Sequence, residues 1–257
     1  MPAQASAPAP AAAPLAAAGL RGIVFDLDGT LIDSRRDIAA AVNGMRAERD
    51  LPPLSVAEVR GMVGEGARAL VRRALPPGTA KADLEEALAS YVARYAEVCL
   101  DTTRPYPGVL PMLAVLAQSF SLGVLSNKGE ALSRRILAGL GLDRYLRELV
   151  GGDTLPTRKP NPGGLFLLAD RLGIPASRLL LVGDSPIDEQ TAAAAGCPFA
   201  LTLWDAAAAP TGDAGQPAGA AAAPAGDAGE ARGHGWRFAR PRDLQAALGL
   251  ADDDDGP

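Results

Sequence analysis

The sequence predicts an α/β protein with a mostly parallel sheet and an inserted all-helical segment. Apolar runs at residues 22–25, 122–125 and 179–182 are long enough for strands buried on both faces, and each run ends at a polar cluster. Residues 34–102 contain helical patterns and no convincing strand. From Pro107 onward, strand and helix patterns alternate, which is typical of a parallel sheet.

The inserted segment carries helical spacing in two places. Ile38, Val42 and Met45 recur on one helical face, and a second set consists of Leu84, Leu88, Tyr91, Val92 and Tyr95. An insertion just after the first strand lies above the edge where strand ends bring polar groups together. We therefore expect residues 34–102 to form a helical cap domain over that edge.

The remaining elements alternate along the chain. We expect helices at residues 107–118, 130–140, 162–173, 188–195 and 241–248, and further strands at 199–203 and 236–238. Gly141 and Gly196 are typical of helix ends, and Asn161 with Pro162 is typical of a helix start. Residues 20–33 and 103–250 should together form the core domain.

Three segments fall outside this pattern. Residues 1–19 and 206–233 are rich in Ala, Pro and Gly but poor in large apolar side chains, so burial cannot offset the entropy of ordering them. We expect a disordered tail at residues 1–19, a loose loop insertion at 206–233 and an acidic tail at 251–257.

Composition excludes several classes of function. The formal net charge is −5, and residues 252–255 supply four of the negative charges, so the rest of the chain carries −1. Lys and Arg are scattered, which argues against a nucleic-acid or membrane partner. Cys99 and Cys197 suggest buried thiols rather than a disulfide framework. His234 is the only histidine, which excludes a multi-histidine metal site.

Location and assembly are predicted more coarsely. The first residues lack a basic n-region and an uninterrupted apolar stretch, and no run is long and apolar enough to span a bilayer. We expect a cytoplasmic protein that acts as a monomer or homodimer.

Two carboxylates follow the first apolar run. A turn after Asp26 would bring its carboxylate and that of Asp28 to one pocket, where the pair favours a cation. Mg²⁺ prefers hard oxygen ligands, and Asp184 from another strand end would also hold it. An ionised Asp26 can attack phosphorus to form an aspartyl-phosphate, with Asp28 as general acid and base. Alternatively, Asp-Gly-Thr, which includes Thr30, is only a turn with helix-capping residues.

Two other polar clusters could bind the phosphate. Ser126 and Asn127 offer donors to phosphate oxygens, or else cap the next helix. Lys159 offers a compact positive charge, or is an exposed surface lysine. Arg158 and Lys128 compete for the same role, and the residues alone do not decide among the three.

The third apolar run ends at Gly183-Asp184-Ser185. Gly183 allows the backbone to approach a metal closely. Asp188 either orients Lys159 or caps the helix that follows. We assign supporting roles to Thr30, Ser185 and Asp188.

Four segments resemble, in order, the motifs of the haloacid dehalogenase superfamily of phosphohydrolases: residues 26–34 (DLDGTLIDS), 126–128 (SNK), 158–160 (RKP) and 183–188 (GDSPID). The resemblance covers residues 20–203 and implies a Rossmann-like core with an inserted cap. It implies Asp26 as nucleophile, Asp28 as acid and base, and Ser126 and Lys159 as phosphate contacts. It also implies Mg²⁺ held by Asp26, the Asp28 backbone carbonyl and Asp184.

Within the superfamily, residues 63–67 (VGEGA), 103–108 (TRPYPG) and 150–153 (VGGD) resemble phosphoglycolate phosphatases. Asp28 argues against the dehalogenases and phosphonatases of the superfamily, so the resemblance implies a phosphoric monoester hydrolase. The three further stretches imply 2-phosphoglycolate as the expected substrate. Arg68 either meets the substrate carboxylate or is a solvated helix residue. The sequence departs from the family after Leu203, where Trp204-Asp205 and the insertion replace a compact loop.

Three alternatives to this function stay open. Sugar phosphates such as N-acetylmuramic acid 6-phosphate are alternative substrates, because related enzymes act on them. A phosphomutase of the same fold would pass the phosphoryl group to a sugar rather than to water. The intact set of Asp26, Asp28, Lys159 and Asp184 argues against a third alternative, a non-catalytic sugar-phosphate sensor.

Overall fold

A computed structural model gives the fold and describes residues 15–204 and 235–250. The expected insertion at 206–233, the acidic tail at 251–257 and His234 lie outside the described residues. Leu15–Ala18 forms a short 3₁₀ helix, η1, and the Leu15 side chain is buried in the core. Residues 15–18, which composition assigns to a tail, are therefore part of the folded chain.

A six-stranded sheet forms the centre of the fold, in the order β5-β4-β1-β6-β7-β8. Its strands are β5 (Glu148–Val150), β4 (Ser121–Leu125), β1 (Gly22–Phe25), β6 (Leu179–Gly183), β7 (Phe199–Thr202) and β8 (Gly235–Phe238). All neighbouring pairs are parallel, so the predicted fold class is confirmed.

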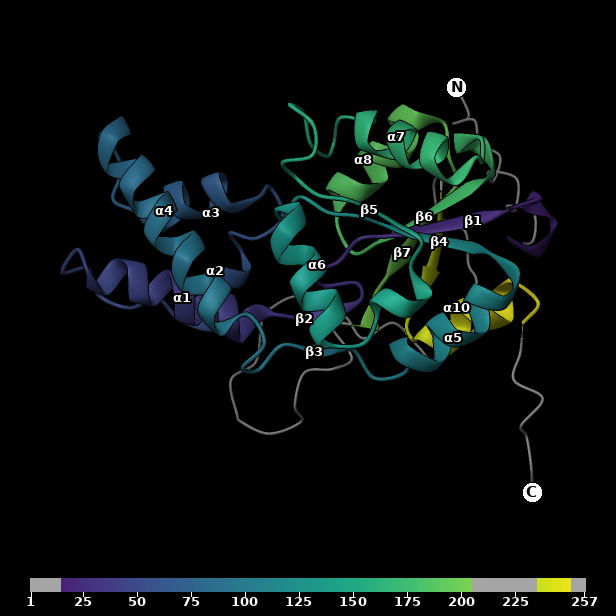
Figure 1. Cartoon of the computed structure of the whole chain (residues 1–257), viewed down its shortest axis with the longest axis horizontal. Helices are drawn as coiled ribbons and strands as arrows, with labels where there is room; N and C mark the ends of the chain where they lie inside the picture. Colours follow the sequence, from purple (N-terminus) through teal and green to yellow (C-terminus); the bar gives the residue numbers. More distant parts are fainter. Residues whose placement is uncertain (1–14, 205–234, 251–257) are drawn as a thin grey trace, which may run out of the picture.

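Helices cover both faces of this sheet (Figure 1). On one face lie α7 (Gly163–Leu172) and α8 (Pro186–Ala195), and on the other α5 (Val109–Ser119) packs against α10 (Pro241–Ala247). Three shorter or flanking elements complete this part: α6 (Glu130–Gly139), η2 (Asp143–Tyr145) and η3 (Ala176–Arg178). Among the described helices, none combines the length and apolar character that a membrane crossing requires.

The core alternates between the two faces along each strand. Ile23 and Phe25 of β1 belong to one apolar cluster, whereas Val24 belongs to the other, because successive strand residues point to opposite faces. Both clusters are fully buried at these positions. Cys99 and Cys197 are buried free thiols, as predicted.

Four helices fill the segment after the first strand: α1 (Arg35–Ala47), α2 (Val56–Arg60), α3 (Ala67–Ala74) and α4 (Lys81–Val98). They lie together at one end of the molecule, beside the sheet (Figure 1). The two predicted helical spacings fall in α1 and α4, which pack against each other. The chain enters and leaves this segment through β2 (Ile32–Asp33) and β3 (Arg104–Pro105), which pair antiparallel. We propose that this short pairing marks the boundary between core and cap.

Three helix starts differ from the prediction. α5 begins at Val109 rather than at residue 107, with Gly108 as its N-cap residue. α8 begins at Pro186 rather than at residue 188, because Ser185 is its N-cap and Asp188 accepts hydrogen bonds from the Ser185 N–H and hydroxyl. α7 begins at Gly163, and Pro162 is its N-cap residue. The Gly163 N–H donates to Asn161 Oδ1 at 2.9 Å. Asp188 of α8 thus caps the backbone of an earlier residue, whereas Asn161 caps that of a later residue in α7.

Asp37 ties α1 to the chain that returns from the helical segment. The carboxylate is buried and accepts hydrogen bonds from the backbone N–H and hydroxyl groups of Thr102 and Thr103. Burial alone would raise the pKa of Asp37, but these hydrogen bonds outweigh it and lower that pKa. The contact therefore stabilises the connection between the helices and the sheet.

Replacing Asp37 with Ala should lower the free energy of unfolding by about 2–4 kcal/mol, because buried donors lose their acceptor. Urea unfolding followed by circular dichroism measures this loss. Because the folded pKa is lowered, the carboxylate's contribution is present above its unfolded value of 3.8 and is lost as the pH falls through the folded value. The difference from wild type should therefore shrink in acid. Asp101→Ala, at an exposed aspartate of the same connection, is the control, and an equal loss there would contradict this account.

Candidate active site

The carboxyl ends of β1, β4 and β6 meet at one edge of the sheet because these strands are parallel neighbours. They bring Asp26, Ser126 and Asp184 to one cavity of about 480 Å³. Residues from the helical segment line its opposite side, among them Gly64, Gly66, Arg68, Leu88, Tyr91 and Tyr95. The cavity therefore lies between the strand ends and the helices, where the sequence predicts the site.

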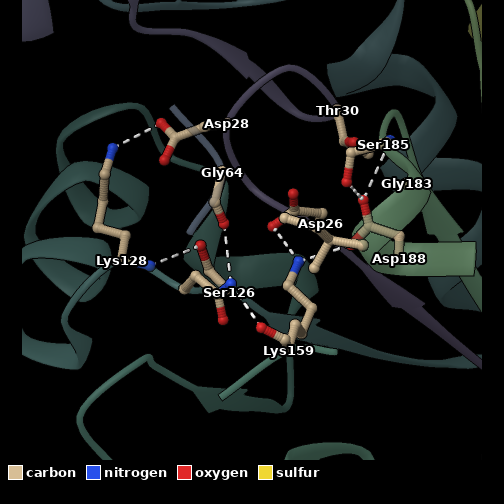
Figure 2. A network of polar contacts seen from close by, with 12 residues as sticks. Asp26, Asp28, Thr30, Gly64, Ser126, Lys128, Lys159, Gly183, Ser185 and Asp188 are labelled. Carbon is tan, nitrogen blue, oxygen red and sulfur yellow. Dashed lines mark hydrogen bonds and ion pairs between the residues drawn. The ribbon is translucent and has the colours of Figure 1, made fainter. Parts of the chain in front are cut away.

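Lys159 is the centre of a buried charge network at this edge (Figure 2). Its Nζ lies 2.8 Å from Asp26 Oδ1 and 2.6 Å from Asp188 Oδ1. Lys159 is 4% exposed and Asp188 is fully buried, so neither is a surface residue. Arg158, its neighbour in the chain, is exposed. Asp188 thus fixes Lys159 against Asp26 while also capping α8 through Ser185.

The charges in this network shift each other's protonation. Burial raises the pKa of Asp26 to about 8; the Lys159 charge opposes this shift, and the charges of Asp188 and Asp184 add to it. Burial, with the Asp188 charge, raises the pKa of Asp184 to about 6. The neighbouring carboxylates overcome burial and raise the pKa of Lys159. Lys159 therefore stays an ammonium, whereas Asp26 needs a further positive charge to be ionised at neutral pH.

Three carboxylates could surround a cation. Oxygens of Asp26, Asp184 and Asp188 lie within 4.8 Å of one another. Both Asp188 oxygens already accept hydrogen bonds from the lysine and from the α8 cap. Asp184 Oδ1 accepts the weaker Thr30 hydroxyl contact at 3.2 Å. Asp26 and Asp184 therefore fit a hard divalent cation better than Asp188 does.

Asp28 lines the same cavity but has separate partners (Figure 2). Its Oδ1 accepts hydrogen bonds from Ser34 Oγ at 2.5 Å and from Lys128 Nζ at 2.6 Å. Lys128 also donates to Tyr95 Oη at 2.7 Å, so the chain of contacts runs from Asp28 to α4. Two carboxylates in different surroundings can take different roles in one reaction.

Ser126 and Asn127 follow β4 and are buried. Ser126 Oγ accepts the Lys128 N–H at 3.2 Å. Asn127 Nδ2 donates to Gly64 O at 2.8 Å and to Lys159 O at 3.1 Å, joining the loop before α3 to the core. Neither side chain caps α6. Because both Asn127 amide hydrogens meet carbonyls, the Ser126 hydroxyl is the better-placed side-chain donor of the two.

Several side chains at the site do not emerge from sequence patterns. The spacing of Tyr91 and Tyr95 predicts only a helix, yet their rings stack with centroids 5.7 Å apart and line the cavity. Trp204, at the start of the departure from the family pattern, is buried and donates its indole N–H to Thr30 O at 2.8 Å. Two tyrosines four residues apart in a helix are a weak signal, and nothing in the sequence places Trp204 beside Thr30.

The chain is similar to known proteins over most of its length. Residues 23–202 match the family model of the haloacid dehalogenase-like hydrolases. A phosphoglycolate phosphatase of Rhodospirillum rubrum is 45% identical over 189 residues, which cover 70% of this chain and 78% of that protein. One from Xanthomonas campestris is 40% identical over 185 residues, covering 72% and 83%. The crystal structure of a predicted phosphoglycolate phosphatase from Haemophilus somnus is 31% identical, with a TM-score of 0.68 and coverage of 72% and 85%. These similarities confirm the resemblance that the motifs indicate.

The loop before α3 approaches the core most closely at Gly66. Its φ is +88°, and a Cβ added there would lie 2.6 Å from Arg158 Nη1 and 3.0 Å from Asn127 O. Gly78, also in the helical segment, has a similar φ of +83°, but nothing lies within 4 Å of its Cβ position. The two glycines thus share a positive φ and differ in their contact with the core.

Gly66→Ala should lower kcat/KM for a phosphate ester roughly tenfold or more, because the loop that lines the cavity must move away from Arg158 and Asn127. Gly78→Ala should leave kcat/KM close to wild type. Both changes strain a left-handed residue at a cost of about 1 kcal/mol, so thermal unfolding should show similar losses from backbone strain. Steady-state turnover of p-nitrophenyl phosphate measures the difference, and equal kcat/KM values in the two variants would contradict it.

Proposed function

The chain belongs to the haloacid dehalogenase-like hydrolases and is an enzyme of that class, and on this basis we propose that it is a Mg²⁺-dependent phosphatase of 2-phosphoglycolate. The products would be glycolate and phosphate. The observation that carries the proposal is the convergence of Asp26, Asp28 and Asp184 on one cavity, with Lys159 held against Asp26. Relatives named phosphoglycolate phosphatases, 40% and 45% identical, support the choice of substrate.

Asp26 acts as the nucleophile in this proposal. One carboxylate oxygen bonds to phosphorus as the bond from phosphorus to the ester oxygen breaks, which leaves an aspartyl-phosphate and the glycolate oxygen. Lys159, held by Asp188, stays charged beside Asp26 and offsets the negative charge of the phosphoryl group. The buried Ser126 hydroxyl is the further donor to a phosphoryl oxygen.

Asp28 moves the protons. It gives a proton to the departing ester oxygen in the first step and takes one from the water that attacks phosphorus in the second. The second step restores the Asp26 carboxylate and releases phosphate. Ser34 and Lys128 hold the Asp28 carboxylate in place for both steps.

Mg²⁺ would be held by the carboxylates of Asp26 and Asp184 and, as the family resemblance implies, by the Asp28 backbone carbonyl. The donor set fits, because these are hard oxygen ligands and both carboxylates lie in a cluster short of positive charge. When bound, Mg²⁺ supplies positive charge to the phosphoryl oxygens. Thr30 supports Asp184, and Ser185 supports Asp188.

A sugar phosphate is the second candidate substrate. The cavity volume of about 480 Å³ exceeds what a two-carbon ester needs, and that volume favours a larger leaving group. A phosphomutase would use the same aspartyl-phosphate but would release no inorganic phosphate. A cytoplasmic location and a monomeric or homodimeric state stay predictions from the sequence.

With Mg²⁺ present, the protein should release inorganic phosphate from 2-phosphoglycolate faster than from sugar phosphates, nucleotides or pyrophosphate. The short substrate places its ester oxygen beside Asp28 without straining the helical segment. Asp26→Asn should lower turnover by roughly a thousandfold or more, because an amide cannot form the acyl phosphate. A phosphate-release assay over this panel measures both. Equal or higher rates on N-acetylmuramic acid 6-phosphate would contradict the substrate, and full turnover by Asp26→Asn would contradict the mechanism.

Mg²⁺ should raise the melting temperature more at pH 8 than at pH 6. In the metal-free protein, burial raises the pKa of Asp26 from 3.8 to about 8 and that of Asp184 from 3.8 to about 6. The folded protein binds these protons more tightly than the unfolded chain does. Its free energy of unfolding therefore falls as the pH rises from the unfolded pKa values through the folded pKa values. A cation takes the place of the protons, so its stabilising effect grows over this range.

Thermal unfolding with and without MgCl₂ at the two pH values measures this dependence. Asp184→Asn, which keeps the size of the side chain but removes one ligand charge, should show a smaller Mg²⁺ shift at pH 8. A shift of equal size at both pH values in the wild-type protein would contradict the assignment of these carboxylates as ligands.

A further inference from the structure

We propose that Lys128 recognises the carboxylate of the substrate, and so makes the site selective for a short acidic phosphate ester. This inference rests on the proposed function, because it takes Asp28 as the group that protonates the ester oxygen. The sequence alone left Lys128 as a competitor for the phosphoryl group. The structure separates it from Lys159 and places it at the other end of the substrate.

Lys128 lies close to where the carboxylate of the substrate would be when the ester oxygen meets Asp28. In 2-phosphoglycolate a single methylene separates the ester oxygen from the carboxyl carbon. If Asp28 meets the ester oxygen, the carboxylate must lie among the groups that touch Asp28. Lys128 Nζ lies 2.6 Å from Asp28 Oδ1 and lines the same cavity. Lys159 contacts Asp26 and Asp188 instead, so the two lysines lie in different parts of the site.

The Lys128 ammonium has more donors than its contacts within the described residues use. An ammonium has three N–H donors. Within the described residues, two of them are taken by Asp28 at 2.6 Å and Tyr95 Oη at 2.7 Å. The third is available to a ligand in the cavity. A carboxylate oxygen is the acceptor that gains most from a charged donor.

The Lys128 ammonium lies in buried surroundings beside aromatic rings. The Lys128 side chain is 7% exposed, and its Nζ also lies 4.8 Å from the centroid of the Tyr95 ring. The Tyr91 ring stacks on that of Tyr95, and both tyrosines are buried. Burial raises the pKa of each tyrosine, so both stay neutral beside the lysine. In such weakly polar surroundings a charged contact to a ligand is stronger than at the surface.

Two of the other cations that line the cavity are less suited to this role. Arg68, the candidate from the sequence, forms two hydrogen bonds with Glu85 at 2.6 and 2.7 Å, and its side chain is 47% exposed. Arg35 forms a similar pair with Asp33. Both arginines already meet a carboxylate of the protein with the fork of their guanidinium group. An exposed, paired arginine discriminates less between ligands than a buried lysine does.

The test compares two substrates that differ only in the carboxylate. Lys128→Met keeps the aliphatic stem and removes the charge. It should lower kcat/KM for 2-phosphoglycolate by roughly a hundredfold more than kcat/KM for ethyl phosphate, which lacks the carboxylate. Any effect of Lys128 on Asp28 acts on both substrates and cancels in the ratio. Arg68→Met is the matched comparison, and the ratio should stay within about threefold of wild type.

Each outcome separates the inference from the proposed function. If Lys128→Met lowers kcat/KM for both substrates equally, or if Arg68→Met shows the selective loss, the assignment of Lys128 is wrong while the phosphatase stands. If the wild-type protein hydrolyses ethyl phosphate as well as 2-phosphoglycolate, the substrate itself is wrong and the inference falls with it. Should Lys128→Met fail to fold by circular dichroism, Lys128→Gln carries the same comparison with a polar, uncharged side chain.

Discussion

The contact on which the site depends is the buried ammonium of Lys159 between two carboxylates. Asp26 follows β1 and Asp188 lies in the first turn of α8, and each would be costly to bury alone. Counting Asp184, three carboxylates surround one lysine, which leaves a formal charge of −2 if all are ionised. The protein supplies too little positive charge to hold this cluster ionised. A divalent cation would bring the sum to zero, which explains why the same cluster that positions Asp26 is also suited to hold Mg²⁺.

The strand order of the sheet brings the polar groups of the site to one edge. β1 lies between β4 and β6, so the segments that follow these three strands meet at one edge. The strands are short and fully apolar over most of their length, and their polar groups begin only where each strand ends. The buried sheet thus fixes the backbone from which Asp26, Ser126 and Asp184 project. Asp37 performs the corresponding task for the helical segment, because it fixes α1 to the returning chain.

How much of this could be predicted from the sequence depends on the range of the interaction. Strands β1, β4 and β6 are apparent because their apolar runs are local patterns, and the motif residues follow them directly. The sequence pattern predicts the start of α8 two residues late, because the cap residue Ser185 is also part of a motif. β2 and β3 leave no pattern, since two-residue strands are too short for a period. The contacts of Lys128 with Asp28 and Tyr95 span 100 and 33 residues, and no local pattern reveals such pairs.

The segment after β4 links the two halves of the site. Three consecutive side chains serve different neighbours: Ser126 lies in the cavity, Asn127 holds the loop at Gly64, and Lys128 contacts Asp28 and Tyr95. A shift of the helical segment therefore acts on the core through Gly64 and Tyr95 together, and both contacts lead back to adjacent residues of one strand end. The position of the helices and that of the Asp28 carboxylate are thus not independent. In the proposed roles, the lysine that would select the substrate also positions the carboxylate that would move its proton, which would couple recognition to catalysis without a separate moving part.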